Sequence, residues 1–425
     1  MNIGRINKFY FYAYTGKKCG SIMIRYTFSD TINKDRLAQA VNITLPQFPF
    51  LKLTPIVSPE GDITFLENTE PCTVYSLNEE HKNLGTADTN GYMFAVRADG
   101  NRIEITAFHG FGDVRAINRF ATDVLLRYLS LVGLVKDDFS TNDTPNGNAE
   151  ETLYEKCLSF KGKLSPNRYQ KKNVFVLPGD TPLTGTPEFH VFRIKYPLDA
   201  FLSRVKGMNG SPTSFLSALI GESISSLYNT GEDIITASVP VDMRRILDSD
   251  AQSNFTVNAD LPYFHGDTEL PFEERVIRQK KFLSEQISPD NLISAVLSYG
   301  DMIEDVMKVP LSDRKTVEML QRKTVEVARK QKTYLLTNVG LLKFPEYAMG
   351  QIMDVLVTLP LIEDSPIACI TAFGNTGCIN WFQNSDDRLL VENIREKLVN
   401  YGIEAELFDE GRETSDTVEP YLYVR

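Results

Sequence analysis

A histidine and an aspartate four residues apart form the segment of this sequence best suited to chemistry. The segment is Ile105 to Arg115, ITAFHGFGDVR. An unperturbed imidazole has a pKa of about 6.5, so His109 could accept a proton near neutral pH. Gly110 and Gly112 would leave room for a substrate beside the ring. The pattern is therefore typical of a general base at the end of a strand, with Asp113 close by.

Each of these residues also has a purely structural interpretation. Asp113 stands where the N-cap of a helix is expected, and a carboxylate there would accept hydrogen bonds from backbone N–H groups. An isolated histidine is often a hydrogen-bonded core residue, and two nearby glycines can serve only to make a turn. The residues alone leave both interpretations open.

The sequence lacks the motifs of several common enzyme classes. Residues 110–112 read GFG, but the third glycine of a dinucleotide-binding GxGxxG would fall at Arg115, whose side chain would block the close packing that glycine permits. There is no GxSxG, HExxH or P-loop signature. His81, His190 and His265 lack partners at metal-binding spacing, so no metal site is expected.

The histidine segment is predicted to join a strand to a helix. Gly91–Arg97 and Arg102–His109 have the pattern of a hairpin, and the Asp-Gly pair between them supplies the positive φ of a tight turn. From Val114 to about Gly133, apolar residues recur at helical spacing. Alternation along the strand places the histidine on one face and Phe108 on the other.

The rest of the chain alternates between predicted strands and helices, which indicates an α/β fold with mixed sheets. Residues 136–151 are polar and are expected to form a loop or linker. We expect two lobes, residues 1–180 and residues 181–425. Strands are predicted at Ser21–Phe28, Phe189–Tyr196, Ile234–Val241, Asn254–Leu261, Thr333–Val339, Ile352–Leu359, Ile367–Phe373 and Cys378–Phe382, and helices within Thr31–Phe48, at Ser214–Tyr228, three times between Phe272 and Lys332, and at Asp387–Asn400.

Composition narrows the partners of the chain. Its 425 residues are 42% hydrophobic and 24% charged, as in folded proteins of more than one unit. The net charge of -11 argues against nucleic acid, and the densest basic stretch, residues 161–172, is expected to be a solvated connector. Five cysteines without a CxxC pair predict reduced thiols. No apolar run approaches the ~20 residues of a membrane span, and a cytoplasmic protein is expected.

Several segments together resemble one superfamily. Residues 108–129, FHGFGDVRAINRFATDVLLRYL, resemble the HHxxxDG active-site segment and following helix of the chloramphenicol acetyltransferases, condensation domains and alcohol acetyltransferases. Residues 31–52 are similar to the first helix and FPxL turn of that superfamily, residues 237–255 to its PVDLR...GN region, and residues 335–346 to its SNLG...P strand. These markers span most of the chain.

The resemblance implies a fold and a support for the histidine. The superfamily has two related α/β lobes in a V, forming a pseudo-dimer with the histidine midway along a central channel. His109 matches the second, catalytic histidine. The aspartate of the motif forms a salt bridge with an arginine, which keeps the histidine loop in shape. The position within VDMRR indicates Arg244 as the partner of Asp113, with Arg245 as the second choice.

The reaction implied is acyl transfer from a thioester, on coenzyme A or a carrier protein, to a hydroxyl or an amine. No permanently bound cofactor is needed. His109 Nε2 would remove the proton of the acceptor and then return a proton to the leaving thiolate. The oxyanion needs a hydrogen-bond donor. Asn254 is the first candidate, and Ser253, Thr337 and Asn338 are the others.

Two residues depart from the motif. Phe108 replaces its first histidine, and Val114 replaces its glycine and could narrow the channel. Residues 338–344, NVGLLKF, stand where peptide-forming condensation domains have a DFGWG-type segment, which favours a stand-alone acyltransferase. The alternatives are a non-catalytic member that binds a carrier protein or a hydrophobic ligand, and a thioester hydrolase with water as the acceptor.

Overall fold

The chain forms a mixed α/β structure with several sheets, as the sequence predicted. The computed structural model describes residues 3–16, 20–134, 147–148, 150–178, 188–361, 365–419 and 421–422. The boundary predicted between residues 180 and 181 lies outside the described residues, and so do Cys19 and most of the polar segment predicted at 136–151. The division of the chain into two lobes at this boundary stays a prediction.

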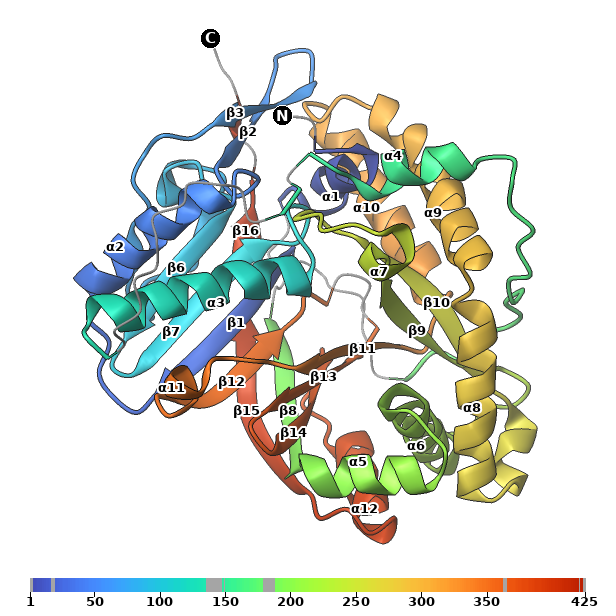
Figure 1. The fold of residues 1–425 in the computed structure, drawn as a ribbon. Helices are drawn as coiled ribbons and strands as arrows, with labels where there is room; N and C mark the ends of the chain where they lie inside the picture. The colour runs from blue at the N-terminus through green and yellow to red at the C-terminus, as the bar shows by residue number, and fades with distance from the viewer. Residues whose placement is uncertain are drawn as a thin grey trace.

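A five-stranded sheet carries the histidine segment. Its strand order is β12-β1-β7-β6-β4, and helices α2 and α3 pack side by side against it (Figure 1). Alternate residues of β1, such as Ile22, Ile24 and Tyr26, are fully buried, because one side of the strand faces the hydrophobic core. The elements are β1 (Ser21–Phe28), β4 (Val74–Tyr75), β6 (Phe94–Asp99), β7 (Arg102–Phe108), β12 (Ile352–Thr358), α2 (Lys34–Thr44) and α3 (Val114–Leu131).

A seven-stranded sheet has the order β10-β9-β11-β13-β14-β8-β15. A second hydrophobic cluster, which includes Trp381 and Phe215, lies between this sheet and its helices. The elements are β8 (Glu188–Pro197), β9 (Ile235–Asp242), β10 (Thr256–Tyr263), β11 (Tyr334–Leu341), β13 (Ile367–Phe373), β14 (Thr376–Gln383), β15 (Glu406–Thr414), α5 (Leu198–Gly207), α6 (Pro212–Leu227), α8 (Phe272–Gln286) and α12 (Leu389–Asn400).

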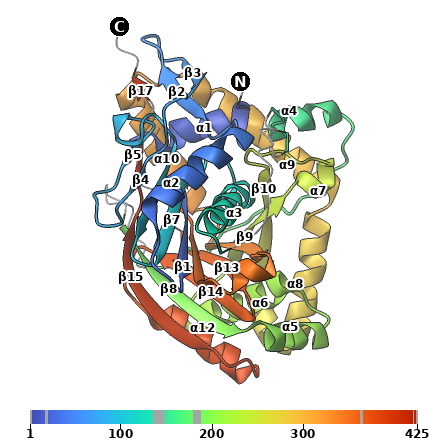
Figure 2. The ribbon, with the colours of Figure 1, turned by 60° about the vertical axis from the view of Figure 1, so that its left-hand side comes forward.

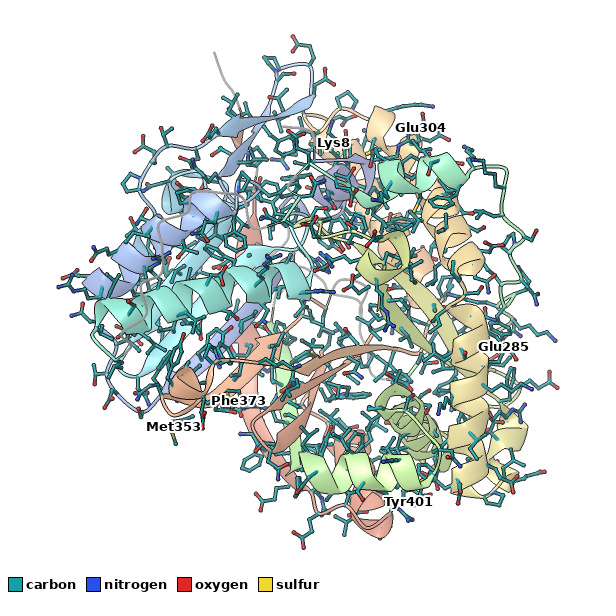
Figure 3. The ribbon with its side chains drawn as sticks, in the orientation of Figure 1. Lys8, Glu285, Glu304, Met353, Phe373 and Tyr401 are labelled. Atoms are coloured by element: carbon teal, nitrogen blue, oxygen red, sulfur yellow. The ribbon has the colours of Figure 1, made fainter. Side chains whose placement is uncertain are left out.

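A group of helices, α1, α4, α9 and α10, packs together beside β10. Figure 3 labels Lys8 of α1 and Glu304 at the end of α9, where the Arg5 guanidinium lies 3.0 Å from the Glu304 carboxylate. The elements are α1 (Arg5–Tyr14), α4 (Leu153–Cys157), α9 (Pro289–Glu304) and α10 (Arg314–Arg329).

The remaining elements are short. They are the strands β2 (Leu53–Val57), β3 (Ile63–Glu67), β5 (Asn83–Leu84), β16 (Thr417–Val418) and β17 (Tyr421–Leu422), the helices α7 (Arg244–Leu247) and α11 (Glu346–Met349), and the 3-10 turns Leu45–Gln47, Ala87–Thr89, Leu158–Phe160, His265–Glu269 and Val306–Lys308.

The last part of the chain connects the two large sheets. After β11 the chain leaves the seven-stranded sheet, pairs β12 with β1 of the five-stranded sheet, and returns as β13. Figure 2 shows the long strand β15 beside β8 along one side of the molecule. From β15, Glu413 accepts two hydrogen bonds from Arg25 of β1, at 2.8 and 3.0 Å. These contacts fix the two sheets relative to each other.

Most predicted elements are present with similar bounds. The strands at Ser21–Phe28 and Ile367–Phe373 are confirmed residue for residue. The hairpin turn is tighter than predicted, because Asp99 pairs with Arg102 and leaves only Gly100, at φ +55°, and Asn101 between them. The strand predicted from Asn254 begins only at Thr256. The sequence interpretation missed α1, α5 and β15.

Candidate active site

His109 occupies the turn between β7 and α3, as the sequence predicted. Its backbone N–H donates to the carbonyl of Gly20 at 2.8 Å, which ties the end of β7 to the chain just before β1. Within the turn, the N–H of Gly112 donates to the carbonyl of His109 at 3.3 Å. His109 as a whole residue is partly exposed. Both neighbouring elements therefore fix the backbone of a histidine that is not fully buried.

The imidazole has a defined tautomer. His109 Nδ1 lies 3.1 Å from the carbonyl oxygen of Gly112. A carbonyl oxygen can only accept a hydrogen bond, so Nδ1 carries the proton of the neutral ring and Nε2 has a free lone pair. Burial lowers the pKa of His109, against smaller raising effects of the backbone and of the Asp113 charge. The ring is therefore favoured in its neutral form, with Nε2 able to accept a proton.

Asp113 fills two structural roles, the helix cap expected from the local sequence and the ion pair expected from the resemblance. Its Oδ1 accepts a hydrogen bond from the N–H of Ala116 at 3.0 Å, which caps α3. The carboxylate also pairs with Arg244, at 2.8 and 3.2 Å, and accepts from the N–H of Phe255 at 2.9 Å. Asp113 is 3% exposed and Arg244 4%. The ion pair expected from the resemblance is thus present, with Arg244 and not Arg245 as the partner.

Arg244 uses every N–H donor of its guanidinium. Besides the two bonds to Asp113, it donates to the carbonyls of Ala251 at 2.8 Å and Ser253 at 2.7 Å, and to Asp242 Oδ1 at 3.0 Å. Arginine has five N–H donors, and this arrangement occupies all five. The side chain therefore ties the loop after α7 to the histidine turn at the start of α3.

Side chains of the protein lie close against the two glycines of the turn. A Cβ on Gly110 would lie 2.3 Å from the Phe108 ring and 2.9 Å from the Cβ of Tyr10, and a Cβ on Gly112 would lie 3.1 Å from that of Ala116. Phe108 is fully buried, with its ring centroid 4.7 Å from that of Phe11. Neighbouring side chains thus occupy the Cβ positions of both glycines, and the room that they leave for a substrate beside the imidazole stays a prediction.

Tyr10 is a residue of the site that the sequence interpretation missed. Helix α1 places its ring centroid 5.0 Å from that of His109, with the rings tilted by 45°. The Tyr10 hydroxyl oxygen accepts a hydrogen bond from Asn254 Nδ2 at 2.9 Å. Helix α1 is anchored on its other side, where Gln321 donates to the carbonyls of Tyr12 and Thr15. The aromatic run at residues 9–12, FYFY, was the available sequence signal.

The structure separates the four candidates for the oxyanion donor. Asn254 is buried and donates to the hydroxyl of Tyr10, whose ring lies beside that of His109. Ser253 Oγ donates instead to the carbonyl of Glu151. Asn338 is exposed and donates to Thr213 at 3.3 Å, and Thr337 is largely buried within β11. The assignment of Asn254 as a substrate contact stays a prediction.

Other features of the described residues lie away from the histidine turn. A cavity of about 460 Å³ lies near the junction of α8 and α9 and includes Glu285, labelled in Figure 3. Its lining residues are Ser165, Asn167, Glu285, Gln286, Ser288, Pro289, Asp290 and Asn291. No cluster of three or more potential metal ligands occurs in the described ranges, and none of the helices described there is long and apolar enough to cross a membrane.

Comparison with known proteins adds evidence from structure. No protein-family model and no curated protein sequence matches the chain. The structure of polyketide synthase associated protein 5 from Mycobacterium tuberculosis matches with a TM-score of 0.63 and 14% identity, over 89% of this chain and 92% of that one. The EpoB NRPS cyclization-docking bidomain from Sorangium cellulosum matches with a TM-score of 0.60 and 13% identity, over 93% and 82%.

A fungal acetyltransferase shares the same architecture. TRI3 trichothecene 15-O-acetyltransferase from Fusarium sporotrichioides matches with a TM-score of 0.57 and 12% identity, over 94% of each chain. Identities this low carry evidence about the fold alone. The chain thus shares the fold of these acetyltransferase and NRPS structures, as the superfamily resemblance implied.

Proposed function

We propose that this protein is an acyltransferase that moves an acyl group from a thioester to a hydroxyl or amine acceptor, with His109 as the general base. One observation carries the proposal. His109 Nδ1 donates to the Gly112 carbonyl at 3.1 Å, and this bond leaves Nε2 unprotonated on a residue that is partly exposed. A neutral imidazole held in this way is suited to remove a proton from an attacking group.

The proposed reaction has two proton transfers and no covalent enzyme intermediate. Nε2 takes the proton of the acceptor as its oxygen or nitrogen forms a bond to the thioester carbonyl carbon. The carbon–sulfur bond of the tetrahedral intermediate then breaks, and the proton on Nε2 passes to the thiolate. While the ring is a cation, its Nδ1–H bond to Gly112 strengthens. Asp113 holds the turn through Arg244 and takes no proton.

Exposure and pKa together support a channel at the histidine. His109 and Tyr10 keep accessible surface, yet burial is the largest cause of their pKa shifts, lowering that of His109 and raising that of Tyr10 to about 12. Tyr299, whose pKa is raised by burial and by Tyr10, is also partly exposed. Partial exposure of residues whose side chains are desolvated supports the proposal of a channel at His109, as in the superfamily arrangement of two lobes in a V.

The partners proposed are a small-molecule acceptor and an acyl donor on coenzyme A or on an acyl carrier protein. The likeness to an O-acetyltransferase supports a small-molecule acceptor, and the likeness to an NRPS bidomain supports a carrier-linked donor. Both donors present the same thioester carbonyl to Nε2. The chemistry at His109 is therefore the same for either, and the shape of the channel selects between them.

The test is free-thiol release from a panel of acyl-CoA thioesters and acyl-loaded carrier proteins, with and without pooled alcohols and amines. We expect acceptor-stimulated release that falls by about 10²–10⁴-fold in His109→Ala. His265→Ala is the matched control, because this histidine is exposed in a turn far along the chain. Its release should equal that of the wild type.

Each other outcome changes the proposal in a defined way. Full activity in a folded His109→Ala protein would eliminate the general base. Release that needs no acceptor would indicate thioester hydrolysis. No release from any donor, by a folded wild-type protein that binds the thioester, would reject the enzyme and favour a binding member of the fold.

A further inference from the structure

One hydrogen bond beside His109 has Asn254 as its donor. An amide nitrogen has no acceptor lone pair, so Asn254 Nδ2 donates and the Tyr10 hydroxyl oxygen accepts, at 2.9 Å. The hydroxyl proton of Tyr10 is therefore not used in this bond. Within the described part of the chain, no acceptor is recorded for that proton. A tyrosine next to the candidate base thus has a hydrogen-bond donor available.

Exposure decides which of the two side chains can reach a ligand. Asn254 is 2% exposed, and its Oδ1 accepts a hydrogen bond from Thr256 Oγ1 at 3.0 Å. Tyr10 is partly exposed, and its ring lies 5.0 Å from the imidazole, centroid to centroid. The amide is thus buried and held by Thr256, and Tyr10 is the more exposed partner of the bond.

We propose that the Tyr10 hydroxyl donates a hydrogen bond to the thioester carbonyl oxygen as this oxygen becomes an oxyanion, and that Asn254 orients the hydroxyl. This inference rests on the proposed acyl transfer. It names Tyr10 as a catalytic residue and moves Asn254 from a direct donor to a positioning residue. The proton stays on Tyr10 throughout, because the bond is shared with the oxyanion and no transfer is needed.

The surroundings of Tyr10 suit a donor better than a base. Burial raises its pKa to about 12, with a smaller raising effect from the charge of Asp113, so the hydroxyl remains protonated wherever the imidazole works as a base. Its position is also rigid. On the far side of α1, Gln321 donates to the backbone carbonyls of Tyr12 and Thr15, and the Arg5 guanidinium donates to Tyr154 at 3.1 Å. A fixed donor needs little reorganisation when charge develops.

The first experiment compares Tyr10→Phe with Tyr12→Phe in the thiol-release assay. Both variants remove one hydroxyl from the same helix, and both leave an aromatic ring in place. We expect kcat to fall about 10²-fold in Tyr10→Phe with little change in KM, because the bond forms only as the oxyanion develops. Tyr12→Phe should stay within twofold of the wild type. An active wild type with an equally active Tyr10→Phe variant overturns the role of Tyr10 and leaves the acyl transfer intact.

A second variant reverses the orienting bond. In Asn254→Asp, a carboxylate would accept the hydroxyl proton of Tyr10 and turn it away from the substrate. We expect a loss of kcat similar to that of Tyr10→Phe, and little further loss in the double variant, since both changes remove the same donor. Additive losses would overturn the orienting role of Asn254.

The titration of His109, followed by NMR in the free protein, separates a donor from a merely structural tyrosine. Tyr10→Phe should leave that titration unchanged while kcat falls. A shift of the titration together with the loss of kcat would show that the hydroxyl acts through the imidazole, and it would overturn the oxyanion contact. A wild type that is inactive with every donor would remove this inference together with the proposed function.

Discussion

Two groups of side chains meet the histidine turn, and they differ in how completely their hydrogen bonds are used. Asp113 and Arg244 are almost fully buried, and every N–H of the guanidinium has a partner. Tyr10 and His109 are partly exposed, and each keeps one polar group available, the hydroxyl proton and Nε2. The first group has no donor left for a ligand, whereas the second is the one to which we assign ligand contacts in the proposed reaction.

The difference shows how one turn can be both rigid and reactive. A buried ion pair gives little net stability, but it strongly penalises any arrangement that separates its charges. Asp113 caps α3 and pairs with the loop after α7, so the backbone on both sides of that ion pair is fixed. The histidine can then stay partly exposed without becoming mobile. The stabilising contacts and the proposed chemistry thus fall on different residues.

The largest expected effect on stability comes from breaking the ion pair of Asp113 and Arg244. Arg244→Leu would leave the Asp113 carboxylate buried without its partner, and we expect the free energy of unfolding to fall by about 3–5 kcal/mol. Denaturant titration measures this loss. Arg245→Leu is the matched control, because Arg245 is exposed at the neighbouring position and should change stability by less than about 0.5 kcal/mol. Equal losses in the two variants would contradict the central role of the ion pair.

A smaller effect on stability is expected at Gly110, the residue after His109 in the turn. In Gly110→Ala the new methyl group would lie 2.3 Å from the Phe108 ring, and we expect a loss of about 1–3 kcal/mol from overpacking. Gly207→Ala is the control, since its Cβ would meet nothing within 4 Å at the end of α5. Thermal unfolding measures the stability of both variants. A Gly207→Ala protein less stable than Gly110→Ala would contradict the overpacking at Gly110.

The parts of the fold that local sequence determines were predictable. The strand Ser21–Phe28 alternates because one of its faces is buried, and α3 begins at a side-chain cap and ends before Gly133, at φ +78°. The ion pair of Asp113 with Arg244 followed from a resemblance and not from spacing, because the two residues lie far apart in the chain.

The parts that depend on distant contacts were missed. The hydroxyl of Tyr10 contacts Asn254 only after α1 packs against α9 and α10, and no local pattern encodes that packing. Strand β15, ELFDEGRET, lacks an apolar alternation because it is an edge strand with many exposed residues. Its charged residues serve other partners, as Glu413 does for Arg25 of the other sheet. The periodicity of the sequence therefore does not predict side-chain contacts between separate elements.

The smallest expected effect is a pH dependence that sharpens the contrast between the two groups. The pKa of His109 is lowered in the folded protein, so the neutral ring contributes stability above about pH 6.5 that is lost as the pH falls through the folded pKa. The same protonation removes the base, and kcat/KM should decline on the acid side with a midpoint below 6.5. Tyr10, with a pKa of about 12, should add no alkaline limb near neutral pH. The pH profile of kcat/KM, measured from acid to alkaline pH, tests both expectations. An acid midpoint above 6.5 would mean that the surroundings of His109 stabilise the imidazolium, which would contradict the lowered pKa and leave a smaller fraction of the ring neutral near pH 7.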